Sequence, residues 1–136
     1  MELTDPTPSS RGACLAWAEA ALTRAGSPSP WLDALTLLMR ATQMPQTLLL
    51  GEPQHAMTST KHARYVAWVA RRAEGEPVAY ITGHKAFMGL DLLVDRRTLL
   101  VRPSTQWLVE AALESIRHRP EEADVAGLLA ADIGTG

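Results

Sequence analysis

The strongest constraint on the fold of this 136-residue chain is a series of short apolar stripes with helical spacing between residues 10 and 75. Apolar residues three and four positions apart lie on one side of a helix, so each segment predicts a helix with a single apolar side. Such a helix has to bury that side, and its neighbours along the chain are helices of the same kind. The sequence therefore predicts a small helical bundle.

Glycine and proline divide this region into four expected helices. The first covers residues 13–25 and ends at Gly26, and a short third helix fits between residues 45 and 51. The second begins with Ser29 as N-cap and Pro30 at the first helical position. Its predicted apolar stripe consists of Trp31, Leu35, Leu38 and Met39.

The fourth expected helix is capped by a hydroxyl residue within 58–60 and ends at Gly75. Arg71 and Arg72 lie near its end and could meet an acidic partner. Cations at a helix end favour the helix dipole, so a solvated face is the favoured interpretation. The predicted stripe of this helix consists of Tyr65, Val66, Val69 and Ala73.

The pattern changes after Pro77. Residues 87–95 and 96–103 form two extended runs with Arg96 and Arg97 between them, which predicts a β-hairpin. A helical pattern returns over residues 104–118, with Ser104 or Thr105 as cap. Its expected stripe contains Leu108, Val109, Ala112 and Ile116.

Composition limits the partners that the chain can have. The net charge of −2 provides no positive field for a polyanion, so we expect no direct contact with nucleic acid. The single cysteine, Cys14, excludes an internal disulfide and fits the cytoplasm, and its place on an apolar stripe predicts an inert core thiol. We expect a monomer without a membrane span.

Histidine and tryptophan residues offer no site of their own. The four histidines are too scattered for the close ligand spacing of a structural zinc site, so no metal ligand is assigned. The four tryptophans lie on or beside helical stripes, where core packing is the expected role.

The last residues contain a possible ligand site. An apolar run leads through Asp132 into Gly134, Thr135 and Gly136, as a strand does before a tight glycine turn. Such a turn lets the backbone approach a ligand where any Cβ would collide. Taken alone, this short motif is more often an ordinary turn than a cofactor site.

Several motifs together are more specific. The run "GEPVAYITG" covers residues 75–83, a predicted hairpin follows around Phe87, and "LVEAAL" covers residues 108–113. An "AG…P…DA" signature begins at Ala25 and includes Asp33. With these motifs the chain resembles the HemK family, the release factor glutamine methyltransferases.

The resemblance implies a mainly α-helical chain in three parts. Residues 1–77 would form a helical substrate-docking bundle and residues 78–103 a β-hairpin linker. Residues 104–136 would supply the first helix and strand of a Rossmann-like α/β methyltransferase domain, truncated at its first cofactor motif. The implied cofactor is S-adenosylmethionine, with Asp132, Gly134, Thr135 and Gly136 at the cofactor and Thr105 as a secondary contact.

The implied activity is N5-methylation of a glutamine side chain in a peptide chain release factor. No catalytic residue is assigned, because the family's Asn-Pro-Pro-Tyr substrate motif would lie beyond Gly136, and we expect these 136 residues to be inactive alone. The sequence also departs from the family pattern at Ser104 and Gln106, which are neutral where acidic residues are usual.

Three other interpretations remain open at this point. A ribosomal-protein glutamine methyltransferase has a similar architecture, although "AYITGHKAF" over residues 79–87 is more similar to the release factor branch. The chain could instead serve as a non-catalytic helical module that docks a release factor or another protein. An unrelated helical protein with a chance glycine turn is the third.

Overall fold

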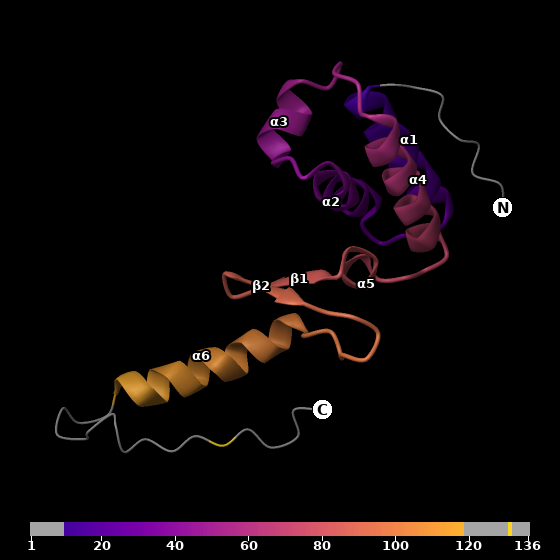
Figure 1. Cartoon of the computed structure of the whole chain (residues 1–136). Coiled ribbons are helices and arrows are strands. Elements are labelled where there is room, and N and C mark those ends of the chain that lie inside the picture. The colour runs from indigo at the N-terminus through magenta and orange to yellow at the C-terminus, as the bar shows by residue number, and fades with distance from the viewer. Residues whose placement is uncertain (1–9, 119–130, 132–136) are drawn as a thin grey trace. The chain divides into compact units, whose positions relative to one another are not determined.

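The computed structural model describes residues 10–118 and residue 131. Contacts divide the chain into two units, with the boundary between Gly83 and His84. Figure 1 shows a helical first unit, and a second unit with a two-stranded hairpin and one long helix. A mainly helical chain with a helical bundle and a β-hairpin is therefore confirmed. The elements are α1 (Arg11–Arg24), α2 (Pro30–Thr42), α3 (Gln46–Gly51), α4 (Ser59–Ala73), α5 (Val78–Thr82), β1 (His84–Phe87), β2 (Leu90–Leu93) and α6 (Pro103–Arg117).

The start of α1 is held by a loop that is distant in sequence. The Ser10 hydroxyl accepts from the Ala13 amide at 3.3 Å, which caps the helix. The amide of Gly12 donates to the carbonyl of Pro53 at 2.8 Å. A Cβ on Gly12 would lie 3.0 Å from the Cβ of Pro53, so a larger residue here would push against Pro53.

The core of the helical unit lies among α1, α2 and α4. Tyr65 of α4 is fully buried, and its hydroxyl donates to the Ala34 carbonyl of α2 at 3.1 Å. Its ring meets Trp17 of α1 edge-on at 6.5 Å between centroids. Burial raises the pKa of the Tyr65 phenol well above its usual range, with a smaller contribution from Cys14. Cys14 itself is fully buried, which confirms its core position.

The predicted stripes are correct in part. Leu35, Leu38 and Val69 are buried, but Trp31 in the first turn of α2 remains 41% exposed. Leu37 is fully buried although it lies off the expected stripe, because α2 packs against α1, α3, α4 and α5 rather than against one neighbour. A helix with several neighbours buries more than one stripe.

Other details of the helical unit differ from expectation. Ser29 occupies the N-cap position of α2, but its side chain makes no capping hydrogen bond. Thr58 caps α4 as expected, since its hydroxyl accepts from the Lys61 amide at 3.4 Å. The short helix α5 was not predicted, and it packs against α2 and α4 through Ile81, which is 5% exposed.

The hairpin exists, but its position was predicted wrongly. Strands β1 and β2 are antiparallel, with His84 opposite Leu93 and Phe87 opposite Leu90. The turn therefore falls at residues 88–89 and not at Arg96 and Arg97. Met88 and Gly89 both have positive φ, at 49° and 81°, which two-residue hairpin turns of this kind require.

Helix α6 was predicted correctly in extent but not in packing or cap. Arg102 is the N-cap and Pro103 takes the first helical position, so neither Ser104 nor Thr105 is the cap. No residue of α6 is buried, and Trp107 is 74% exposed, against the expectation of core packing for tryptophan. The expected final strand lies outside the described residues.

We predict that Val69→Asp destabilises the helical unit by about 3 kcal/mol or more, because it buries a charge without a partner. Val69 is fully buried, whereas Ala67 is exposed on the other side of α4. Ala67→Asp is the matched control and should change stability by about 0.5 kcal/mol or less. Urea unfolding followed by circular dichroism measures both. Equal midpoints for the two variants would contradict the core position of Val69.

Candidate functional site

The structure describes only one of the residues expected at the cofactor. Thr105 lies in the first turn of α6 and is partly exposed, and its amide donates to the Arg102 carbonyl at 2.9 Å. Asp132, Gly134, Thr135 and Gly136 lie outside the described residues. The cofactor assignment of these five residues therefore stays a prediction.

A cavity of about 180 Å³ lies beside the start of α6, within the second unit. Gln106 lines it, while Thr105 does not. The Gln106 amide nitrogen donates to the Glu110 carboxylate at 2.7 Å, one turn further along the helix. The walls come from β1, the hairpin turn and the first turn of α6, namely Lys85, Ala86, Phe87, Met88, Val101, Arg102, Pro103 and Gln106.

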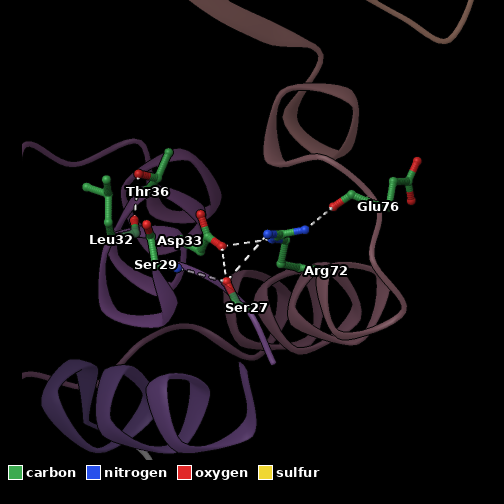
Figure 2. Close-up of polar contacts among 7 residues, drawn as sticks. All are labelled: Ser27, Ser29, Leu32, Asp33, Thr36, Arg72 and Glu76. Atoms are coloured by element: carbon green, nitrogen blue, oxygen red, sulfur yellow. Dashed lines mark hydrogen bonds and ion pairs between the residues drawn. The ribbon is translucent and has the colours of Figure 1, made fainter. Parts of the chain in front are cut away.

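The helical unit contains a denser polar cluster where α2 begins and α4 ends. Figure 2 shows the guanidinium of Arg72 directed at the carboxylate of Asp33. Their Nε and Oδ2 atoms are 2.8 Å apart, and each side chain is only 15% exposed. The same Oδ2 accepts from the Ser27 hydroxyl at 2.6 Å, so the loop before α2 joins the pair. Arg72 thus connects α4 to α2 and to the preceding loop.

Glu76 connects this cluster to the turn that follows α4. Arg72 Nη1 donates to the Glu76 carbonyl at 3.3 Å. Arg71 binds the Glu76 carboxylate with two hydrogen bonds, of 2.6 Å from Nε and 2.8 Å from Nη2. Hydrogen bonding to Glu76 raises the pKa of the Arg71 guanidinium, and the charge of Glu76 adds to this effect. Arg71 and Arg72 therefore both bind Glu76, which directly precedes Pro77 and the start of α5.

Sequence reasoning favoured a solvated face for Arg72 over an acidic partner, and the favoured interpretation was wrong because Arg72 pairs with Asp33. The residue is mostly buried against Asp33, which is 39 positions earlier in the chain. A pairing over this separation leaves no local pattern. The available signal was that Asp33 and Glu76 both belong to the motifs quoted for the family resemblance.

The described residues contain no cluster of three or more potential metal ligands. Among the same residues, no helix is both long and apolar enough to cross a membrane. Among residues 10–118, polar side chains gather at the arginine cluster and at the cavity beside the start of α6.

Comparison with known proteins identifies the helical unit. The sequence model of the PrmC N-terminal domain matches residues 13–83, and this range ends at the boundary between the two structural units. The match contains the core of the bundle together with the Arg72–Asp33 pair.

Full-length relatives extend the match beyond the helical unit. The release factor glutamine methyltransferase of Pseudomonas aeruginosa is 44% identical over 109 residues, covering 80% of this chain and 37% of that relative. The enzyme of the same name from Agrobacterium fabrum is 40% identical over 115 residues, covering 85% and 39%. The one from Burkholderia pseudomallei is 37% identical over all 136 residues, which are 42% of its length.

The names of these relatives place the chain in the class of protein methyltransferases. Its described part consists of a helical domain followed by a hairpin and a helix. The chain belongs to the family of release factor glutamine methyltransferases, whose PrmC N-terminal domain it contains. It spans about two fifths of the length of the curated relatives that it matches.

We predict that Asp33→Ala destabilises the helical unit by about 2 to 4 kcal/mol, because it leaves the mostly buried Arg72 without its carboxylate. The matched control is Asp95→Ala, which breaks the exposed ion pair with Arg97 and should leave the melting temperature unchanged. Thermal unfolding followed by circular dichroism separates the two. If both variants melt like the wild-type protein, the cluster does not hold α2 to α4.

Proposed function

We propose that this chain serves an S-adenosylmethionine-dependent enzyme that methylates the amide nitrogen of a glutamine side chain in a peptide chain release factor. The observation that carries the proposal is the match of residues 13–83 to the PrmC N-terminal domain. The helical unit of residues 10–83 folds around its own core and holds the Arg72–Asp33 pair. Relatives named release factor glutamine methyltransferase support the substrate.

The proposed reaction requires accurate placement of both reactants. An amide nitrogen is a weak nucleophile because its lone pair is delocalised into the carbonyl, so the enzyme has to aim it at the sulfonium methyl. We assign substrate docking to the helical unit. The turn at Gly134–Gly136, with Asp132, would carry the cofactor, and Thr105 would lie near it. The single cysteine of the sequence lies buried in the core, which fits a cytoplasmic enzyme.

A chimera tests this proposal. Residues 1–136 would replace the matching N-terminal segment of the Pseudomonas aeruginosa enzyme, which is 44% identical over 109 residues. We expect the chimera to transfer the tritiated methyl group of S-adenosylmethionine to a release factor, and not to ribosomal protein. The 136 residues alone should transfer none.

The chimera with Gly134→Val is the matched test of the cofactor turn. A valine side chain there should obstruct the approach of the cofactor and lower its affinity at least about tenfold, while release factor binding is unchanged. A folded chimera that binds S-adenosylmethionine but methylates only ribosomal protein would support the alternative substrate. A folded chimera without any methyl transfer would overturn the proposal.

A second candidate function is a non-catalytic module that docks a release factor. The exposed apolar residues of α2 favour it, because Trp31 is 41% and Leu32 57% exposed. Exposed tryptophan is a frequent anchor in protein interfaces.

We predict that the double variant Trp31→Ser and Leu32→Ser weakens release factor binding by the 136-residue chain about tenfold or more. Leu99→Ser is the matched control, since Leu99 is 86% exposed in the second unit, and it should bind like the wild-type chain. Biolayer interferometry with immobilised release factor measures the affinities. Equal loss in both variants would assign docking to another surface.

A further inference from the structure

Glu76, in the turn between α4 and α5, is held through both its side chain and its backbone. Arg71 donates to its carboxylate from Nε at 2.6 Å and from Nη2 at 2.8 Å. The backbone carbonyl of Glu76 accepts from Arg72 Nη1 at 3.3 Å, and Figure 2 shows this carbonyl facing Arg72. The Glu76 amide donates to the Arg71 carbonyl at 3.2 Å. The end of α4 therefore fixes this single turn residue by four hydrogen bonds.

The side-chain pair fixes geometry more than it adds stability. The Glu76 side chain is 12% exposed, but that of Arg71 is 41% exposed. An arginine with this exposure remains hydrated when its partner is removed, so the loss of the pair changes the free energy of unfolding little. A bidentate pair nevertheless defines the relative position of the two groups that it joins. Removal of the Glu76 carboxylate should therefore leave the helical unit folded.

The turn leads directly into α5, the last element of the helical unit. Pro77 is the N-cap, and its carbonyl accepts from the Ile81 amide at 3.1 Å. Ile81 is 5% exposed and belongs to the core. Gly83 is the C-cap of α5, and β1 begins at the next residue, His84. The chain thus leaves the helical unit through a five-residue helix that Glu76 holds at its start and Ile81 holds in the core.

We propose that Glu76 is a positioning residue for methyl transfer to the release factor. This role rests on the function proposed above, in which the helical unit docks the substrate and the following part of the chain carries the cofactor. Two reactants held through a stiff connection meet at a higher effective concentration than two joined by a flexible one. By fixing the start of α5, Glu76 fixes the direction in which the chain leaves the docking unit. Its loss should lower the rate of transfer and not the affinity for the release factor.

Hydrogen exchange in the 136-residue chain measures the hold on α5. We expect the Ile81 and Gly83 amides, which donate to carbonyls of the same turn and helix, to exchange at least about tenfold faster in Glu76→Ala. The amide of Tyr65 in the core should exchange as in the wild-type chain, and the melting temperature should stay within about 5 °C. Glu74→Ala is the matched control, since it removes the same group from an exposed position two residues earlier. Unchanged exchange in α5 would overturn the proposal.

Kinetics of the chimera described above separate positioning from docking and from chemistry. The substrates are the intact release factor and a short peptide with the same glutamine, which needs no docking to the helical unit. In Glu76→Ala we expect kcat for the release factor to fall at least about tenfold. The Kd of the release factor and kcat for the peptide should stay within about twofold of wild type, and Glu74→Ala should change none of the three values.

The partner residue provides an independent route to the same result. Arg71→Ala should lower kcat for the release factor like Glu76→Ala, and the double variant should be no slower than either single variant, because all three lack the same contact.

Each other outcome contradicts the positioning role in its own way. Equal losses with the release factor and the peptide would show a general loss of activity, and a weaker Kd would place Glu76 in the docking surface. An unchanged kcat for the release factor in an active chimera would overturn the role of Glu76 alone. An inactive chimera with the wild-type residues would overturn the function proposed above, and this role with it, so the two failures are distinguishable.

Discussion

The ion pair between Arg72 and Asp33 is the contact on which the arrangement of the helical unit depends. It joins the end of α4 to the first turn of α2, and Ser27 and Glu76 extend it to the loop before α2 and the turn after α4. Removing two charges from water is costly, so such a pair is favourable only when additional hydrogen bonds satisfy both groups. Here the carboxylate accepts from Ser27 and the guanidinium donates to the Glu76 carbonyl. The cluster therefore fixes geometry more than it adds net stability.

Tyr65 fixes the same helix pair from the apolar side. Its hydroxyl binds the carbonyl of Ala34, the residue after Asp33, while Arg72 lies two helical turns further along α4. Tyr65 and Arg72 are about 10 Å apart along α4, and both contact the first turn of α2. This spacing fits two helices whose axes cross at an angle. Figure 1 shows α2 beside α4, with the two helices running in different directions. Small residues of the core, Ala18, Ala21, Ala34 and Ala41, let the helix backbones approach closely.

Periodicity was sufficient to predict α1 to α4 and α6, because apolar spacing and start or stop residues are local signals. It did not predict α5 or the burial of Leu37, because both depend on contacts between elements distant in sequence. The predicted turn of the hairpin lay too far along the chain, because the positive φ of Met88 has no clear sequence signal. The Arg72 cluster depends on tertiary packing, so charge pattern alone favoured solvent for Arg72 over the acidic partner that it has. Of the expected cofactor residues, only Thr105 lies in the described part of the chain.

The two units differ in how far they bury their own apolar residues. The core cluster consists of residues from α1 to α5, whereas no residue of α6 is buried and Leu93 of β2 is 79% exposed. A helix with an exposed apolar face gains little stability from packing and is marginal at this length in water. The helical unit therefore contains the interactions that its own fold requires. Substitutions of its exposed residues should leave the fold intact, whereas changes to Asp33 or Arg72 should destabilise it.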